Sequence, residues 1–273
     1  MSQRSVIAAT DLSKRSAHVA GRAARLAQTL GARLILAHVG HDDAPGPLAG
    51  LGLGRSKETP ETAMTALAEA HGAEVRLLVG DPSTELAKLA TTENALLIVL
   101  GLHRERRVLD LLRLTTMERI VLDAPCPVLI AHQPPDHDYA QVLALSDFSA
   151  ASAFALATAA QIAPDARFHA VHALRLPIGA ALKQGGRESD AAREKAKSLR
   201  EAFLAHPGLP ALSEPPEIVP GGVHQVLAFR REELAADLVC IGAHSGRDPK
   251  ALGNYARDLM RAPPTDLLVA KPA

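Results

Sequence analysis

The chain has 273 residues, which is long enough for one large domain or for two of ordinary size. Its 30 Lys and Arg residues balance its 30 Asp and Glu residues, and aromatic residues make up only 3% of it, with no Trp. Nucleic-acid-binding proteins usually combine a basic excess with stacking aromatic side chains, so this composition argues against a nucleic-acid partner.

The two cysteines, Cys126 and Cys240, stand in apolar segments and predict small core side chains rather than a disulfide framework or a metal knot. Such cysteine usage suits a reducing cytosol. No apolar run approaches the roughly 18 residues that span a bilayer, and the first residues enter a strand-like run without a signal peptide. We therefore expect a cytoplasmic protein with no membrane partner.

Predicted strands and helices alternate along the first half. Near-continuous apolar runs, typical of strands covered on both faces, predict strands near 5–10, 33–39, 74–79, 95–101 and 127–131. Helices are predicted at 14–30, 83–93 and about 115–123. Gly31 ends the first helix, and Ser83 is the expected N-cap of the second. The second half repeats this order, with an alanine-rich helix at 150–162 and a charged one near 188–206.

The sequence contains an internal repeat of four blocks that recur in the same order. They are VIAATDLS (6–13) with VLALSDFS (142–149), ARLILAHV (32–39) with ARFHAVHA (166–173), NALLIVLGLH (94–103) with ADLVCIGAH (236–244), and APCPVLI (124–130) with APPTDLLV (262–269). The proline-rich HQPPDHD at 132–138 separates the copies, so we predict one domain over 1–132 and another over 139–273.

The alternation of strands and helices predicts the fold class of each half. Strands that alternate with helices form a parallel, doubly wound α/β sheet. Ligands of such sheets bind at the carboxyl ends of the strands, near the point where the strand order reverses. We therefore look for a site at the carboxyl ends of the strands in each half.

Five blocks of the chain resemble the universal stress protein family, namely VIAATDLS, LGARLILAHV, LLVGDPSTELAKLA, NALLIVLGLH and TTMERIVLDAPCPVLI. The resemblance covers nearly all of 5–132 and, more loosely, 141–270, and it identifies the chain as a tandem member. It implies two flavodoxin-like, Rossmann-like doubly wound domains, related by a pseudo-twofold and paired through their last strands at 127–131 and 266–270. A homodimer of the chain and an unidentified protein partner are left open.

Some members of this family bind ATP and others do not, and the resemblance places the difference in the loop after the fourth strand. Binders carry Gly-x2-Gly-x9-Gly-(Ser/Thr) there, because glycines with positive φ let backbone N–H groups approach the phosphates. An Asp at the end of the first strand and an apolar residue after the His of the second strand hold the nucleoside end. ATP would bring Mg²⁺ with it, and otherwise no cofactor is required.

The first half departs from this pattern at two of the three glycines. The residues that match are Asp11, Val39, Gly101 and Thr115, and His103 flanks the cleft. Arg104 and Leu114 stand where the second and third glycines belong. A Cβ at a position of positive φ costs on the order of 1–2 kcal/mol, and the side chain also fills phosphate space. We therefore predict a degenerate site in the first half.

The second-half loop, GAHSGRDPKALGN at 242–254, is the better candidate for nucleotide binding. Its candidate residues, with those of the preceding strands, are Asp147, Ala173, Gly242, His244, Ser245, Gly246, Gly253 and Asn254. The loop is shortened between Gly242 and Gly253 but keeps small residues, and Asn254 can cap the next helix in place of a hydroxyl. An adenine nucleotide, if one binds, is expected here.

Arg104 suggests a sharper hypothesis for the first half. Asp11 persists although two glycines of the loop are gone, so the guanidinium of Arg104 can fold back onto Asp11 and take the place of a ligand. The alternative is a solvated face, because the arginines of 104–107 lie near Glu105 and Asp110.

Other motifs favour structural interpretations. GLGLG at 50–54 lacks the spacing of a dinucleotide fingerprint and predicts a surface segment. Ser245 lacks the glycine that a nucleophile elbow carries two residues earlier. His41, Asp42 and Asp43 share one loop and predict a solvated run, so no metal site is assigned. His38 and His172 end the second strand of each half and are repeated positions, as are His103 and His244 after the fourth strand. For His103 and His244, which flank the cleft, contact with a ligand and capping of backbone groups are both left open.

The sequence thus predicts a stress-response protein with a sensing or interaction role, in which ATP or another adenine nucleotide, if one binds, occupies the second half. No catalytic residue is assigned, because neither loop offers a positioned base, and at most slow ATP hydrolysis is expected. Two alternatives stay open. One is a nucleotide-independent interaction and dimerisation module, and the other is a sensor of a different small ligand.

Overall fold

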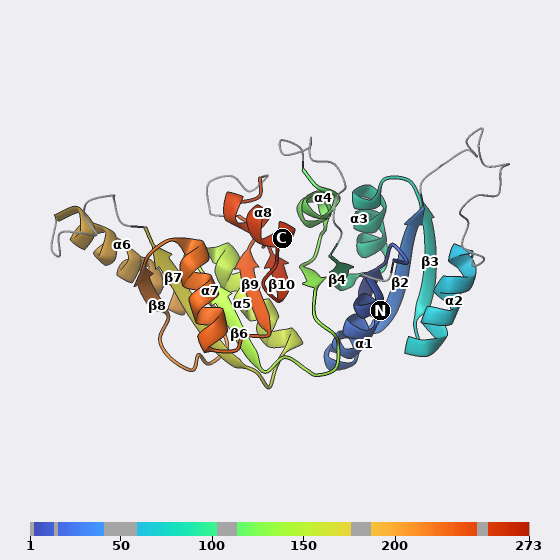
Figure 1. Ribbon diagram of the computed structural model, residues 1–273, viewed down its shortest axis with the longest axis horizontal. Helices are drawn as coiled ribbons and strands as arrows, with labels where there is room; N and C mark the ends of the chain where they lie inside the picture. The colour runs from blue at the N-terminus through green and yellow to red at the C-terminus, as the bar shows by residue number, and fades with distance from the viewer. Residues whose placement is uncertain are drawn as a thin grey trace. The chain divides into compact units, whose positions relative to one another are not determined.

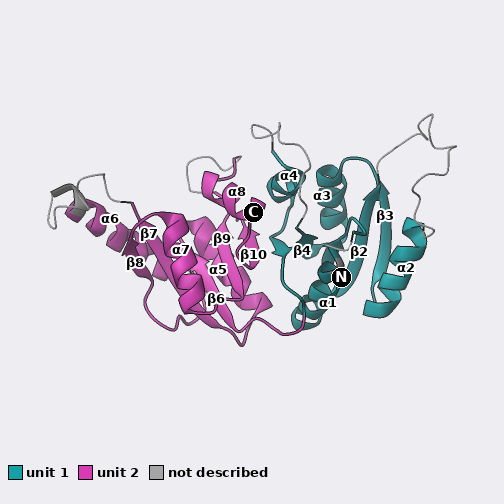
Figure 2. Ribbon diagram, viewed as in Figure 1, with its two compact units in different colours: residues 1–135 teal, residues 136–273 magenta. Residues whose placement is uncertain are grey.

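The computed structural model describes residues 3–13, 16–40, 59–102, 114–175, 187–244 and 251–272. The chain divides into two compact units, Met1–Pro135 and Asp136–Ala273, whose elements are labelled in Figure 1 and coloured by unit in Figure 2. Each unit has its own strands and helices and is described by itself.

The described residues of the first unit form five parallel strands and four helices. Its elements are β1 (Ser5–Ala9), α1 (Ala17–Leu30), β2 (Arg33–Gly40), α2 (Pro60–His71), β3 (Glu74–Val79), α3 (Pro82–Thr92), β4 (Ala95–Gly101), α4 (Thr116–Asp123) and β5 (Val128–Ala131). The strand order is β3-β2-β1-β4-β5, and every pair in it is parallel. The central strands carry the core, since Ile7, Ile35 and Ile98 are fully buried.

The second unit repeats this architecture. Its elements are β6 (Gln141–Leu145), α5 (Ala150–Ile162), β7 (Arg167–Leu174), α6 (Arg187–Leu204), β8 (Glu217–Pro220), α7 (Val223–Glu233), β9 (Leu238–Gly242), α8 (Asn254–Arg261) and β10 (Asp266–Ala270). The strand order is β10-β9-β6-β7-β8, again with parallel pairs only. The predicted doubly wound α/β fold is confirmed.

Helix ends follow the local sequence, with two differences from prediction. Gly31 ends α1 in the left-handed conformation, at φ 58°, as predicted. The N-cap of α3 is Asp81 rather than Ser83, because the carboxylate accepts the N–H of Thr84 and Ser83 lies inside the first turn. Helix α2, for which we had no prediction, begins after Thr59 with Pro60 in its first position.

The topology fixes where a ligand can enter each sheet. From β1 the chain runs outward through β2 to β3, and then returns to β4 on the other side of β1. The loops that leave β1 and β4 therefore diverge, and a crevice opens at the carboxyl ends of these strands. In the second unit the same reversal falls between β6 and β9.

Candidate functional site

A cavity of about 410 Å³ lies at the strand-order reversal of the first unit. Its described lining comes from the carboxyl ends of β1, β2 and β4 and from α3 and α4. Three residues that the sequence assigned to the nucleoside end and the loop, Asp11, Val39 and Gly101, are brought together in it. Small-molecule sites span about 300–1,000 Å³, so the volume suits a compact ligand.

The loop after β1 is held by a hydroxyl pair that sequence reasoning missed. The hydroxyl groups of Thr10 and Ser16 lie 2.9 Å apart, and Thr10 Oγ1 also accepts the N–H of Leu12 at 3.0 Å. Leu12 has φ 59°, a left-handed conformation that is rare for a branched aliphatic residue. The carboxylate of Asp11 accepts the N–H of Ser13 at 2.9 Å, which fixes its direction at the end of the strand.

His38 is tied to the same loop from the neighbouring strand. Its Nδ1 lies 2.9 Å from the carbonyl oxygen of Thr10. Because a carbonyl oxygen only accepts, Nδ1 carries the hydrogen and donates it. The ring therefore has a fixed tautomer when neutral, in which Nε2 is an acceptor, and the side chain lines the cavity.

The second unit repeats this hydrogen-bond network. The hydroxyl groups of Ser146 and Ser152 lie 2.8 Å apart, and Ser146 Oγ accepts the N–H of Phe148 at 2.9 Å. Phe148 has φ 62°, the counterpart of Leu12. Asp147 accepts the N–H of Ser149 at 3.0 Å, and Nδ1 of His172 donates to the carbonyl of Ser146 at 2.9 Å. The sequence repeat could have revealed these hydroxyl pairs, because Thr10 and Ser146 are each followed six residues later by a serine.

The second unit's cavity lies at the equivalent place but measures only about 150 Å³. Five predicted residues line it, namely Asp147, Ala173, Gly242, His244 and Gly253. The imidazole of His244 is buried and its Nδ1 donates to the carbonyl of Ala251 at 2.6 Å, so it caps backbone. This volume is below that of ordinary ligand sites.

The first glycine of each loop is explained by packing rather than by positive φ. A Cβ on Gly242 would lie 2.8 Å from the backbone nitrogen of Ser152, and one on Gly101 would lie 3.0 Å from Val19. Gly253 has φ −60°, which any residue can adopt. At these three described positions, the expected left-handed glycine geometry is therefore not found.

The helix that follows the loop begins differently in the two units. Thr115 caps α4 as predicted, in a capping box with Glu118 in which each side chain accepts the other's backbone N–H. In the second unit Gly253 is the N-cap of α8, and Asn254 is the first helical residue, so the expected Asn254 cap was wrong. Gly253 offers no side chain to satisfy the free N–H groups of the first turn.

Several predicted residues fall outside the described part of the chain. They are His103 and Arg104 in the first half and Ser245 and Gly246 in the second. The hypothesis that Arg104 folds onto Asp11 therefore stays a prediction, as do those on GLGLG and on His41, Asp42 and Asp43.

Two charged groups lie close to the first cavity at the start of α3. The guanidinium of Arg119 on α4 lies 2.7 Å from the carboxylate of Asp81. The hydroxyl of Ser83 and then this guanidinium hold the pKa of Asp81 well below its ordinary value. Asp81 therefore stays ionised and joins α3 to α4 beside the cavity.

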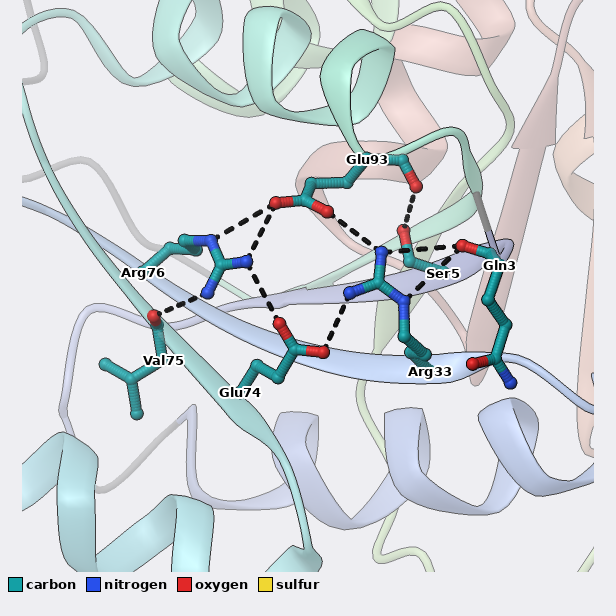
Figure 3. Close-up of polar contacts among 7 residues, drawn as sticks. All are labelled: Gln3, Ser5, Arg33, Glu74, Val75, Arg76 and Glu93. Atoms are coloured by element: carbon teal, nitrogen blue, oxygen red, sulfur yellow. Dashed lines mark hydrogen bonds and ion pairs between the residues drawn. The ribbon is translucent and has the colours of Figure 1, made fainter. Parts of the chain in front are cut away.

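A second charged cluster lies at the amino ends of β2 and β3 and is shown in Figure 3. Arg33 contacts Glu74 at 2.7 Å and Glu93 at 2.9 Å, and Arg76 contacts the same two carboxylates at 3.0 and 2.9 Å. The guanidinium groups lower the pKa of both carboxyls, and for each Arg33 is the first cause. Because the charges alternate and neutralise one another, the cluster is a structural clamp between strands and α3.

Within the described ranges, no group of three or more His, Cys, Asp or Glu side chains could hold a metal ion. None of the described helices is both long and apolar enough to cross a membrane.

Comparisons with known proteins agree with this architecture. The model of the universal stress protein family matches residues 3–132 and again 138–271. A protein of unknown function from Pseudomonas aeruginosa has 20% identity over 99% of this chain and 93% of its own, with a TM-score of 0.66. A universal stress protein from Archaeoglobus fulgidus has 19% identity over 98% of both chains, with a TM-score of 0.61.

A single-domain structure also matches. It is a universal stress protein from Archaeoglobus fulgidus in complex with dAMP, with 23% identity over 48% of this chain and 98% of its own, and a TM-score of 0.35. No curated protein matches the sequence. Because the family model covers both halves, the chain belongs to the universal stress protein family and carries two copies of its domain in tandem.

Proposed function

We propose that the chain is a sensing protein, not an enzyme, that binds an adenine nucleoside or nucleoside monophosphate in the cavity of its first unit. The observation that carries this proposal is the 410 Å³ cavity at the strand-order reversal, lined by Asp11, His38 and Val39. The counterpart in the second unit has about 150 Å³, which favours the first unit over the second-half site expected from the loop sequence.

The proposed ligand follows from which part of the family's nucleotide pattern the first unit keeps. Asp11 and Val39, which the resemblance assigns to the nucleoside end, both line the cavity. A carboxylate accepts several hydrogen bonds, so Asp11 can receive ribose hydroxyl groups in addition to the N–H of Ser13. The phosphate end has lost two glycines to Arg104 and Leu114. A ligand with no phosphate or one phosphate therefore fits this unit better than a triphosphate.

Calorimetric titration of the whole chain with adenosine, AMP and ATP tests the proposal. We expect one molecule of adenosine or AMP per chain, with ATP bound no more tightly. Asp11→Ala should weaken binding about tenfold or more, because it removes a charged hydrogen-bond acceptor. Asp147→Ala is the matched control, since Asp147 occupies the same loop position in the second unit, and it should leave the affinity unchanged.

The outcomes separate the alternatives. Loss of binding in Asp147→Ala but not in Asp11→Ala would return the site to the second unit. Absence of heat with all three ligands would contradict nucleotide binding and favour the nucleotide-independent interaction module. Mass spectrometry of what co-purifies with the chain would then reveal whether the apolar cavity holds a different small molecule.

A further inference from the structure

His38 lines the first cavity with its two ring nitrogens in different surroundings. Nδ1 donates to the carbonyl oxygen of Thr10 at 2.9 Å, just after β1. Among the described residues, no group forms a hydrogen bond with Nε2. Because the hydrogen of the neutral ring is on Nδ1, Nε2 is an acceptor on the other edge of the imidazole, where a ligand can meet it.

Most of the other polar side chains in the described lining also offer a ligand acceptors rather than donors. The hydroxyl of Ser16 donates its hydrogen to the carbonyl of Ser13 at 2.9 Å, so the hydroxyl of Thr10 donates to Ser16. Asp11 carries a carboxylate, which only accepts. The remaining hydroxyl of the described lining belongs to Thr116, and this part of the lining contains no Lys or Arg. The cavity therefore favours a ligand that donates hydrogens.

The second unit has the same histidine bond without an open site. Nδ1 of His172 donates to the carbonyl of Ser146 at 2.9 Å, and its ring stacks on Phe148 with centroids 4.9 Å apart and planes 28° apart. The cavity that His172 lines measures only about 150 Å³. The bond from Nδ1 therefore belongs to the scaffold of both units, and any part of His38 in ligand selection comes from Nε2.

Glu61 provides the competing explanation for His38. It lies in the first turn of α2, and hydrogen bonds from its own backbone and from Thr59, and then the charge of His38, lower the pKa of Glu61. The two side chains are thus within electrostatic reach of one another. In an imidazolium that is held charged by this carboxylate, Nε2 donates a hydrogen instead of accepting one.

We propose that His38 determines the ligand specificity of the first unit, because Nε2 accepts a hydrogen from an amino or hydroxyl group of the bound nucleoside. Nδ1 meanwhile keeps the ring fixed to the end of β1. A ligand that covers Nε2 without supplying a donor removes its hydrogen bond to water and gives nothing in return, so such a ligand binds more weakly. This inference rests on the proposed function, since its ligand is the nucleoside of the same cavity.

Replacement of His38 by asparagine tests the role of Nε2 in the full chain. Asparagine removes Nε2 but keeps a donor in the place of Nδ1, because its amide nitrogen is also bonded to Cγ. In calorimetric titrations with adenosine at about pH 8, where histidine is normally neutral, we expect His38→Asn to bind about three- to tenfold more weakly than the wild type. His172→Asn is the matched control, because His172 makes the same backbone bond, and its affinity should be unchanged.

Analogues that each lack one donor identify the group that Nε2 meets. Purine riboside lacks the amino group of the base, and the three monodeoxyadenosines each lack one ribose hydroxyl. The wild type should bind at least one of these analogues about threefold or more weaker than adenosine, and in His38→Asn that difference should disappear. If every difference seen in the wild type persists in His38→Asn, the proposal is overturned.

Proton–nitrogen correlation NMR at about pH 8 tests the ring itself and needs no variant that folds. We expect the hydrogen of His38 on Nδ1 alone, and a shift of the Nε2 resonance when adenosine is added. A hydrogen on Nε2 in the free chain, as in an imidazolium paired with Glu61, would overturn the proposal. A wild type that binds no nucleoside would contradict the proposed function, and the spectrum of the free chain would still decide whether Nε2 is an acceptor.

Discussion

At the scale of single residues, both units hold a non-glycine residue in the left-handed conformation directly after the first strand's Asp. Leu12 and Phe148 have φ values of 59° and 62°, and the N–H of each donates to the hydroxyl of the residue two positions earlier, Thr10 or Ser146. This conformation costs on the order of 1–2 kcal/mol. Because the strained loop is present in both units although their cavities differ in size, it belongs to the scaffold that aims the Asp side chain.

Gly242 offers a prediction at the same scale. Gly242→Ala places a Cβ 2.8 Å from the backbone nitrogen of Ser152 and 2.9 Å from the carbonyl carbon of Ala151, and neither atom can move like a side chain. We expect the free energy of unfolding to fall by about 1–3 kcal/mol, as in other overpacked cores. Urea unfolding checks this. Gly40→Ala is the matched control, since among the described residues its Cβ would approach nothing closer than the carbonyl oxygen of Leu78 at 3.8 Å. Equal losses in both variants would contradict the packing argument.

At the scale of elements, most of the fold could be predicted from the sequence because parallel sheets give a strong signal. Strand β2, for example, is apolar without interruption over 34–37, and Gly31 marks the end of α1. Helix α2 also carried signals, with Thr59 as cap and Gly72 at its end, but we made no prediction for it. The residues that cap and end this helix could be recognised in the sequence. Its apolar stripe is weak, because only Met64 and Ala68 are buried, and this stripe does not predict a helix.

The candidate site was harder to predict than the elements. The sequence assigned Asp11, Val39 and Gly101 to one site, and all three line the cavity of the first unit, because strand ends in a doubly wound sheet converge. The sequence could not predict the two cavity volumes, which depend on how the lining side chains of each unit pack. Nor could it predict φ at Leu12, because leucine disfavours the conformation that the hydroxyl pair imposes.

The ends of α3 and α7 allow a matched pair of substitutions. After each helix the chain passes through a left-handed residue, Asn94 at φ 52° in the first unit and Ala235 at φ 48° in the second. Asn tolerates this conformation and Ala does not, and Ala235 is exposed, so no packing is lost by changing it. We expect Ala235→Gly to raise the free energy of unfolding by about 0.5–1 kcal/mol.

Asn94→Ala should lower the free energy of unfolding by a similar amount, because it places an alanine in the left-handed conformation, as Ala235 already is in the second unit. Thermal unfolding of both variants beside the wild type measures the pair. If Ala235→Gly instead lowers the free energy of unfolding, the left-handed conformation of Ala235 is not a source of instability at this helix end.

The clamp of Figure 3 predicts how acid affects the first unit. Glu93 contacts both Arg33 and Arg76, and their guanidinium groups lower its pKa in the folded chain. A carboxyl with a lowered pKa stabilises the fold above its unfolded pKa of about 4.3, and this stabilisation is lost as the pH falls through the folded pKa. Glu93→Gln should therefore lower the free energy of unfolding by about 1–3 kcal/mol at pH 7.

The same substitution should reduce the loss of stability between roughly pH 5 and pH 3, so the curves of variant and wild type converge in acid. Urea unfolding at several pH values measures this. Glu69→Gln is a control, since Glu69 is an exposed residue of α2 outside the cluster, and it should shift neither the stability nor its pH dependence. Parallel curves for Glu93→Gln and wild type would contradict the linkage.

At the scale of the whole molecule, the predicted pairing of the units through 127–131 and 266–270 can be argued from each unit alone. Within its own unit β5 pairs only with β4, and β10 pairs only with β9. Strand β5 has the apolar sequence VLIA, and β10, DLLVA, is apolar after its first residue, Asp266. An apolar edge strand left open is an aggregation hazard, and pairing removes it.

We therefore expect the two units to stay together when the chain between them is cut. A protease site inserted between Pro135 and Asp136 leaves the bond from Arg22 to the carbonyl of Pro134 within the first unit. After cleavage, an affinity tag at the N-terminus should retain the second unit, and the pair should elute at the mass of the intact chain, 28.7 kDa. Tyrosine absorbance identifies the second fragment unambiguously, because the first unit contains no aromatic residue. Loss of that absorbance from the tagged fraction would show that the units are held only by the linker, and the edges of β5 and β10 would then need another partner.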